Sequence, residues 1–527
     1  MLVSRKSSPW IAVLLCAAFT GSCLADDPQV KVSGGTIEGL AQKDGTNSFK
    51  GIPFAAPPVG PLRWKFPQPV KPWEGVRPAK AFGHSAQQGT VAAMALGVTG
   101  GMDEDCLYLN VWAPVATNKP LPVMVWIHGG AFTSGSGSQA LYDGSRLAAK
   151  GVVVVTINYR LGSLGFMAHP ELTKEGGGSS GNYGIRDQIA ALGWVRDNIT
   201  AFGGNPGNVT IFGESAGAFS VNILAASPMA KGLFQRAIAE SGGSFAPANK
   251  GDGALGMIHM PLQRAEKEGE KLLGKLKVTS IAKARELPAK DVIDAASAET
   301  TGAAVFDSVV LPKDIYELYA ERKFNDTPVL IGSNSDEAAM FVWGKTAPAI
   351  LEAKAKEGLG EHAAAILALY PHATVDEASL ATKASLTDLA FTWHTWTWAG
   401  MQSSYGKSPA YLYYFDHRPP GSESGANHAS EIAYVFGNLP STGLFSKGPR
   451  PEDKAMSELM MNYWVNFAKT GDPNGGDLPK WPAFSKKEPQ GMVFDAKPAA
   501  RAMPYEKRMG VLDSYFAWRR EQGKAGK

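Results

Sequence analysis

A serine stands at the centre of a glycine-flanked pentapeptide that could carry nucleophilic chemistry. Gly213-Glu214-Ser215-Ala216-Gly217 follows the apolar run Val209 to Phe212 and precedes the helix-compatible stretch Ala218 to Ala226. A strand, a sharp turn and a helix in this order push the serine hydroxyl out of a sheet edge. Glycines on both sides avoid collisions with the neighbouring strand and helix. The context therefore predicts a nucleophile elbow with Ser215 as the nucleophile.

A serine hydroxyl is a poor nucleophile at neutral pH, so it needs a base and an acid that orients the base. After such an elbow, the acid and then the base follow along the chain. His428 lies in a polar loop beyond the apolar run Tyr411 to Phe415. Glu337 follows the run Val329 to Ile331 and a polar turn, and Asp336 competes closely with it on residue chemistry alone.

A glycine-rich stretch could supply backbone N–H donors for the oxyanion that forms during attack on a carbonyl group. His128-Gly129-Gly130-Ala131-Phe132 follows the apolar run Val123 to Ile127. The N–H of Ala216, at the positive end of the helix after the nucleophile, would add another donor. Taken alone, a Gly-Gly pair after a strand is more often an ordinary turn.

Short apolar runs that end at glycine or polar residues predict the buried strands of a mainly parallel sheet. The clearest runs are Val123 to Ile127, Val152 to Ile157, Val209 to Phe212, Val329 to Ile331 and Tyr411 to Phe415. Between two of them, apolar residues recur at steps of three and four from Ile185 to Ile199, which predicts an amphipathic helix across the sheet. Alternation of strand and helix is the signature of the α/β class.

The domain organisation is predicted to be one catalytic domain, residues 26–527, with helical insertions. Residues 255–325 and 345–405 are rich in Ala, Lys, Glu and Leu without a strong strand signal. We expect these segments to form helices that cap the carboxyl end of the sheet and shape a substrate cleft.

Length and charge narrow the class of protein. A chain of 527 residues is long enough for one large α/β core. The net charge of +3 is nearly neutral, and no basic block of the kind that binds nucleic acid or anionic lipid is present. No cluster of His or Cys suggests a metal site, so neither a metal nor a cofactor is expected.

The first 25 residues have the pattern of a secretory signal peptide. Arg5 and Lys6 precede the apolar stretch Trp10 to Phe19, and small residues lead to Ala25. The apolar part is too short to span a bilayer, so we expect a secreted or periplasmic protein without an integral membrane segment. Cys23 stands in a faint lipoprotein-like sequence that lacks the usual leucine, and lipid anchoring is not expected.

The motifs together resemble those of a type-B carboxylesterase of the carboxylesterase and cholinesterase family. The matching stretches run from about residue 30 to the C-terminus, and they are Phe49 to Ala55, Glu104 to Val111, Asn158-Tyr159-Arg160, Phe212 to Gly217 and Glu431 to Gly437. The resemblance implies an α/β-hydrolase fold and an enzyme that hydrolyses small-molecule carboxylic esters through an acyl-enzyme, without a cofactor.

The same resemblance assigns roles to individual residues. It places the acid on Glu337, which ends an Asp-Glu pair, and the base on His428. It places the oxyanion donors on Gly130, Ala131 and Ala216. Ala131 replaces a third glycine found in many relatives, which should matter little if its φ angle is negative.

The chain departs from the family at Cys106. The family's partner cysteine is replaced by Ala86, so Cys106 is expected to be a buried free thiol, as in a bacterial branch of the family. The only other cysteines, Cys16 and Cys23, lie in the predicted signal peptide.

Other residues have structural explanations beside functional ones. Glu214 is expected to support the serine turn more than to tune the site electrostatically, and His128 is expected to brace the oxyanion loop. The cluster Trp393, Trp396 and Trp398 is explained by helix packing as well as by an aromatic cleft.

Two rival functions fit parts of the pattern. A noncatalytic adhesion protein on the same fold would typically lack one member of the triad, and all three are present here. An amide, carbamate or lactone hydrolase would use the same machinery. Because the base must be uncharged, activity is expected to rise with pH through roughly 6 to 7.5.

Overall fold

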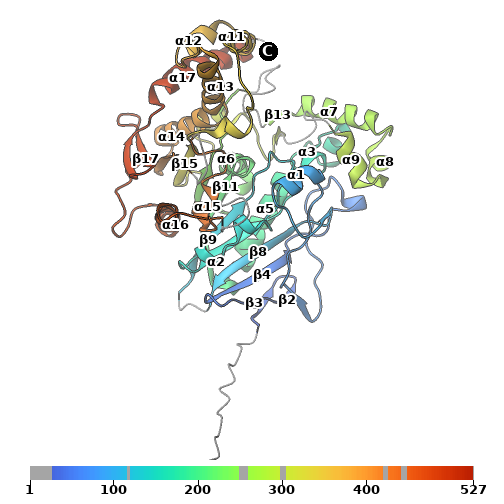
Figure 1. Cartoon of the computed structure of the whole chain (residues 1–527). Helices are drawn as coiled ribbons and strands as arrows, with labels where there is room; N and C mark the ends of the chain where they lie inside the picture. Colours follow the sequence, from blue (N-terminus) through green and yellow to red (C-terminus); the bar gives the residue numbers. More distant parts are fainter. Residues whose placement is uncertain are drawn as a thin grey trace, which may run out of the picture.

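The computed structural model describes residues 27–115, 119–247, 259–296, 304–418, 425–440 and 448–525. The predicted signal peptide, residues 1–25, lies outside these ranges. Figure 1 shows a large twisted sheet with helices on both faces and further helices gathered at one end.

The central sheet is mixed, with a parallel middle and antiparallel edges. Its strands lie in the order β18 (Ala499–Ala502), β17 (Gln490–Phe494), β16 (Ala410–Phe415), β15 (Val329–Asn334), β12 (Arg236–Glu240), β11 (Gly204–Glu214), β9 (Leu121–Ile127), β10 (Val153–Ile157), β8 (Tyr108–Pro114), β4 (Thr46–Pro53) and β3 (Leu40–Ala41). Pairing is parallel from β17 to β10 and antiparallel at β18, β8, β4 and β3. A separate small sheet joins β1 (Gln29–Val32), β2 (Gly35–Glu38) and β5 (Val76–Pro78).

Both faces of the sheet are buried, which explains why its strands are apolar without alternation. In β9, Val123, Val125 and Ile127 point into one core, shared with α5 (Tyr183–Asn198). Met124 and Trp126 point into the opposite core, shared with helices α15 (Ile432–Phe436) and α16 (Pro451–Thr470). Successive side chains in a strand point to opposite faces, so one run of five residues serves two cores.

The predicted α/β-hydrolase class is confirmed. Each of the five predicted strands is present with shifted ends; the largest shift is in β11, which begins at Gly204 rather than at Val209. The predicted helix from Ile185 to Ile199 is α5. The antiparallel strands β4 and β8, beyond β10 in the sheet, were not predicted from the sequence.

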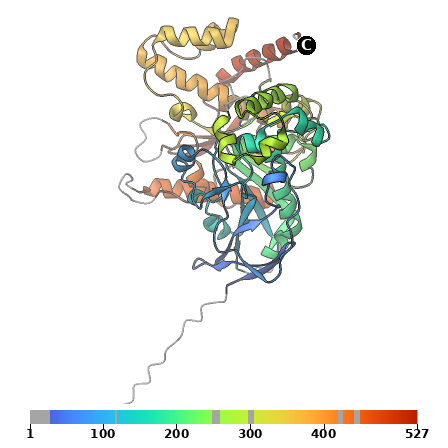
Figure 2. The same ribbon diagram turned by 90° about the vertical axis from the view of Figure 1, so that its right-hand side faces the viewer.

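Two groups of helices lie at the same end of the sheet (Figures 1 and 2). The first comprises α7 (Leu262–Lys275), α8 (Ile281–Glu286) and α9 (Ala289–Ala295), with α10 (Ile315–Ala320) following. The second comprises α11 (Pro348–Leu359), α12 (Ala363–Leu367), α13 (Val375–Thr387) and α14 (Trp393–Tyr405). The first segment also contains a parallel pair, β13 (His259–Pro261) and β14 (Ala304–Phe306), whose three-residue strands are too short to give a sequence signal.

No helix in the described ranges is both long enough and apolar enough to cross a bilayer.

Candidate active site

Ser215 occupies a strained turn between strand β11 and helix α6 (Ala216–Ala226). Its backbone has φ 53° and ψ −122°, an arrangement that costs a non-glycine residue about 1–3 kcal/mol. The Ser215 N–H donates to the carbonyl of Glu240 at 2.9 Å, and the Ser215 carbonyl accepts from Phe219 N–H at 2.9 Å. The turn is therefore fixed by the next strand on one side and by the helix on the other.

The two glycines of the motif are required by the packing around this turn. A Cβ atom on Gly217 would lie 1.9 Å from the carbonyl oxygen of Ile127 in β9. A Cβ atom on Gly213 would lie 2.6 Å from the same oxygen. Both are backbone collisions that no side-chain movement can relieve, so the packing confirms the expectation that glycine is required at these positions.

The carboxylate that contacts His428 belongs to Glu337. His428 Nδ1 lies 2.6 Å from Oε2 of Glu337, and both side chains are buried. Glu337 begins a 3₁₀ turn after β15, and its Oε1 accepts the N–H of Asn334 at 2.6 Å. The neighbouring Asp336 instead pairs through its backbone with Asn427. The contact with His428 thus distinguishes Glu337 from Asp336, which could not be told apart by residue chemistry alone.

The loop that carries His428 is tied to the loop that carries Glu337. Asn334 Nδ2 donates to the carbonyl of Asn427 at 2.9 Å, and Ser335 Oγ accepts the N–H of Ala426 at 2.8 Å. These bonds join segments about 90 residues apart, and they determine where the imidazole lies.

The second ring nitrogen of His428 faces the residue that precedes Ser215. Nε2 lies 3.1 Å from Oε1 of Glu214, whose carboxylate is also buried. Within the described residues, no hydrogen bond joins Ser215 Oγ to the imidazole. The ring therefore lies beside the serine turn and between two carboxylates.

The charges in this pocket shift the pKa values of both partners. Burial lowers the pKa of His428, but the negative charges of Glu214 and Glu337 outweigh it and raise the pKa to about 9. Burial raises the pKa of Glu214 to about 8, against the opposing effect of His428. The Glu214 carboxylate therefore interacts electrostatically with the imidazole in addition to its place in the serine turn.

Two further glutamates with buried carboxylates, Glu431 and Glu240, contact residues at or next to the site and were not predicted as site residues from the sequence. Glu431 accepts Ser241 Oγ at 3.0 Å and Asn334 Nδ2 at 2.5 Å. Burial is the largest cause that raises its pKa, to about 7. Glu240 accepts the indole N–H of Trp464 at 2.8 Å. Glu240 directly follows the apolar residues of β12, and a carboxylate at the end of a buried strand is the one sequence feature that could have indicated it.

The glycine-rich loop after β9 lies directly against the serine turn. A Cβ atom on Gly129 would lie 2.8 Å from the Glu214 carbonyl oxygen and 3.1 Å from Ser215 Cβ. The carbonyl of Gly130 points into its own loop, where it accepts the N–H groups of Thr133 and Ser134, both at 3.0 Å. Gly130 has φ 101°, which favours glycine.

The φ angle of Ala131 is positive, at 54°, and the following Phe132 has φ 59°. The expectation that alanine could replace glycine here with little effect assumed a negative φ angle, so it is wrong on this point. The Ala131 side chain is exposed, while Phe132 is buried against Phe166 with ring centroids 5.0 Å apart. Packing of Phe132 holds the loop in this left-handed conformation, and an alanine bears the strain that a glycine would avoid.

His128 braces this loop from below. Its ring stacks on Tyr159 at 4.5 Å, and the Tyr159 hydroxyl donates to the His128 carbonyl at 2.9 Å. Its Nδ1 lies 2.8 Å from the Gly129 carbonyl. Burial lowers the pKa of His128 to about 4, so its ring is neutral in the physiological range.

Two phenylalanines that the sequence analysis missed pack against the His428 ring. The ring centroids lie 4.7 Å away for Phe391 and 5.3 Å away for Phe341. Phe391 belongs to a π-helical turn, Asp388–Thr392, between α13 and α14. Such turns are frequent at functional sites, but no sequence pattern marks this one.

The remaining residues of interest have structural roles. Cys106 is a buried free thiol, as expected. Glu104 forms a 2.6 Å ion pair with Arg63. Trp393 stacks on Phe516 at 3.7 Å, and Trp398 donates to the Tyr319 hydroxyl, so helix packing accounts for both. Across the described ranges, no group of three His, Cys, Asp or Glu side chains is placed to hold a metal ion.

Comparison with known proteins places nearly all of the chain in one family. The model of the carboxylesterase family matches residues 26–511. The chain is 38% identical to the para-nitrobenzyl esterase of Bacillus subtilis (strain 168), over 91% of this chain and 97% of that protein. It is 36% identical to the fumonisin B1 esterase of Sphingopyxis macrogoltabida, over 92% of this chain and 90% of that protein.

Solved structures agree with this placement. A para-nitrobenzyl esterase structure superposes with a TM-score of 0.80 at 35% identity, covering 92% of this chain and 99% of that one. A carboxylesterase from Geobacillus stearothermophilus gives a TM-score of 0.79 at 33% identity over the same shares. The chain belongs to the carboxylesterase family and is a serine carboxylesterase that hydrolyses carboxylic esters.

Proposed function

We propose that Ser215, His428 and Glu337 are the catalytic residues of this esterase. The observation that carries the proposal is the 2.6 Å contact between His428 Nδ1 and Glu337, with the ring held beside the strained turn of Ser215. Glu337 fixes the tautomer and the orientation of the imidazole. Nε2, the nitrogen that Glu337 leaves open, takes the proton from Ser215.

The reaction proceeds in two stages. In the first, Ser215 Oγ bonds to the ester carbonyl carbon, its proton passes to His428, and His428 protonates the leaving alcohol as the C–O bond breaks. In the second, His428 takes a proton from water, the hydroxide attacks the acyl carbon, and the acid leaves as the proton returns to Ser215 Oγ.

The backbone N–H groups of Gly130, Ala131 and Ala216 stabilise the oxyanion in both stages. The inward turn of the Gly130 carbonyl and the position of Ala216 at the start of α6 support this assignment. The contact of Nε2 with Glu214 does not oppose the proposal, because catalytic hydrogen bonds are often loose without substrate.

Substitution of the nucleophile tests the proposal. Ser215→Ala is expected to lower kcat for a short activated ester by several orders of magnitude. Wild type is expected to take up a fluorophosphonate probe, and Ser215→Ala is not. Turnover by Ser215→Ala within about tenfold of wild type would refute the role of Ser215. Failure of the wild type to label would refute Ser215 as the activated nucleophile.

The remaining proposals concern location and organisation. The protein is exported, with residues 1–25 as a cleaved signal peptide, on the evidence of the charged and apolar pattern around Arg5 and Trp10 to Phe19. Residues 26–527 form one catalytic domain whose helical segments shape the cleft. A hydrolysis panel that varies the acyl chain and the alcohol separately identifies the preferred ester.

A further inference from the structure

A cavity of about 600 Å³ lies at the end of helix α6 that is remote from Ser215. It is lined by the end of α6, the turn η4 (Pro228–Ala230), residues 231–234 and 312–313, α10 and residues 322–327. The length of α6 places this end about 16 Å from the serine turn. The cavity is therefore distinct from the catalytic cleft.

The walls of the cavity are largely apolar. They include Ala226, Phe234, Leu318 and Phe324. A cavity of this size and lining is typical of sites that enclose a small apolar molecule or an alkyl chain.

The rim of the cavity is basic. Four cationic side chains line it, and they are Lys231, Lys313, Arg322 and Lys323. Asp326 is the one acidic residue among the described lining residues, and its carboxylate accepts hydrogen bonds from Gln402 Nε2 at 2.8 Å and from the backbone N–H of Lys407 at 2.7 Å. Both donors are neutral, so Asp326 offsets one of the four positive charges.

One neighbouring carboxylate neutralises only part of this charge. Glu321 pairs with Lys313 at 2.6 Å and with Lys323 at 2.9 Å. The hydrogen bond from Lys313 is the largest cause that lowers the pKa of Glu321 to about 2. Among the described residues, no ion pair involves Lys231 or Arg322. The rim therefore keeps an excess of positive charge.

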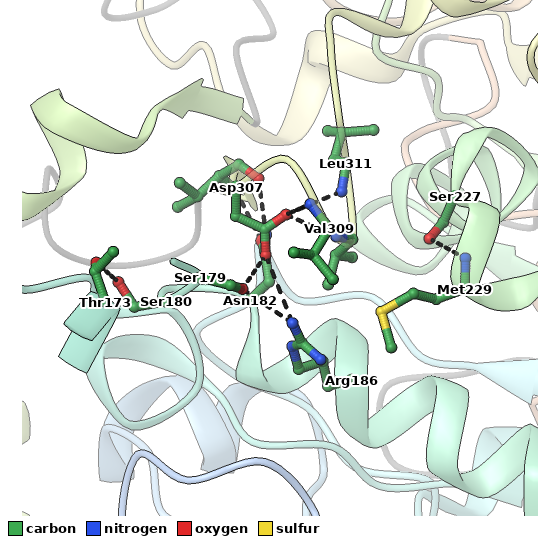
Figure 3. Close-up of polar contacts among 12 residues, drawn as sticks. Thr173, Ser179, Ser180, Asn182, Arg186, Ser227, Met229, Asp307, Val309 and Leu311 are labelled. Carbon is green, nitrogen blue, oxygen red and sulfur yellow. Dashed lines mark hydrogen bonds and ion pairs between the residues drawn. The ribbon is translucent and has the colours of Figure 1, made fainter. Parts of the chain in front are cut away.

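The wall segments are fixed by their own hydrogen bonds. Asp307 Oδ1 accepts the N–H groups of Val310 at 2.7 Å and Val309 at 3.1 Å, and Asp307 Oδ2 accepts Ser179 Oγ at 2.5 Å (Figure 3). This anchors the loop that leads to Lys313.

The opposite wall is fixed in the same manner. Asn325 Nδ2 donates to the carbonyls of Leu224 and Ser227 at 3.0 and 2.9 Å, which ties the segment after α10 to the end of α6. The cavity is thus built before any ligand binds, and binding requires little ordering of the protein.

We propose that this cavity is a binding site for an amphipathic carboxylate, such as a fatty acid of medium length. The alkyl chain lies against the apolar walls, and the carboxylate lies at the rim between Lys231 and Arg322. Burial of the alkyl chain away from water and charge pairing of the carboxylate at the rim both favour binding. The site does not depend on the catalytic assignment.

Isothermal titration calorimetry with decanoate tests the proposal. The double variant Lys231→Gln/Arg322→Gln is expected to bind decanoate at least tenfold more weakly than wild type. The matched control Lys267→Gln/Lys354→Gln removes the same charge from exposed positions on α7 and α11 and is expected to bind like wild type. Ser215→Ala is also expected to bind decanoate like wild type.

Decanol provides the second arm of the experiment. It offers the same chain without the charge and is expected to bind wild type at least tenfold more weakly than decanoate. Equal binding of decanoate by the double variant and wild type, or equal binding of decanol and decanoate, would overturn the proposal. An unchanged near-UV circular dichroism spectrum and unchanged hydrolysis of a short ester show that the double variant is folded.

Discussion

The Nε2 atom of His428 lies 3.1 Å from Oε1 of Glu214. Since Glu337 contacts the other ring nitrogen at 2.6 Å, the imidazole bridges two buried carboxylates. Both negative charges favour its protonated form, and they raise its pKa above the range expected from the sequence alone. We therefore expect the rise of activity with pH to lie above the window of 6 to 7.5 that the sequence predicts.

Removal of the Glu214 charge is expected to move this pH dependence. Glu214→Gln leaves one negative charge beside His428, so the pKa of the imidazole falls and the neutral base is available from a lower pH. The midpoint of kcat/KM against pH is expected to fall by about one unit. Glu357→Gln, an exposed substitution on α11, is the control and is expected to leave the midpoint unchanged. An identical profile for Glu214→Gln and wild type would contradict the coupling.

Substitution of the two adjacent carboxylates separates their roles. Glu337→Gln keeps the size of the side chain but no longer stabilises the imidazolium, and kcat is expected to fall by about 10³- to 10⁴-fold. Asp336→Asn, whose side chain is not the one in contact with His428, is expected to stay within about tenfold of wild type. Steady-state kinetics on a short ester checks both, and the reverse order of effects would assign the acid to Asp336.

The left-handed conformation of Ala131 predicts unequal effects of two substitutions. Ala131→Gly removes the backbone strain but raises the conformational entropy of the unfolded chain. The two effects oppose each other, so the free energy of unfolding is expected to change by no more than about 1 kcal/mol. Ala131→Val places a β-branched side chain at φ 54° and is expected to shift the loop and lower kcat/KM by at least tenfold. Kinetics and thermal unfolding measure the two effects. Wild-type activity in Ala131→Val would show that the loop geometry does not matter for the oxyanion.

The buried ion pair between Arg160 and Asp187 is expected to matter for stability. Arg160 Nη2 lies 2.6 Å from Asp187 Oδ1, and both side chains are buried. Arg160→Met leaves Asp187 uncompensated, at a cost of about 3–5 kcal/mol. For a chain of this length the unfolding temperature is expected to fall by about 3–5 °C. Arg196→Met, which breaks an exposed pair with Asp197, is expected to have no measurable effect on that temperature.

The number of thiols tests the proposed export. Cys16 and Cys23 leave with the signal peptide, so the mature, denatured protein is expected to react with one equivalent of a thiol reagent. The native protein is expected to react slowly, because Cys106 is buried and burial raises the pKa of its thiol. Three reactive thiols after denaturation would show that residues 1–25 are retained.

Much of the fold could be predicted because its signals are local. Strands such as β9 and β10 are buried on both faces and appear as uninterrupted apolar runs, and α5 shows helical periodicity. The antiparallel strands β4 and β8 contain polar residues such as Asn47 and Asn110, so their sequences carry a weaker signal. The short β13 and β14 are defined only by their mutual contact.

By itself, the sequence predicted the strand, turn and helix around Ser215, because the apolar run, the glycine-flanked serine and the helix-compatible stretch follow one another directly. The contact with Ile127 in β9 that requires glycine at positions 213 and 217 is visible only in the tertiary structure. It narrowed the acid to Asp336 or Glu337 on residue chemistry alone. Only the tertiary structure decided that the Glu337 carboxylate contacts His428, that Glu214 faces the other ring nitrogen, and that Ala131 is left-handed. The position of His428 depends on bonds between loops about 90 residues apart, and that of Ala131 on the packing of Phe132 against Phe166. Such long-range contacts leave no periodic pattern in the chain.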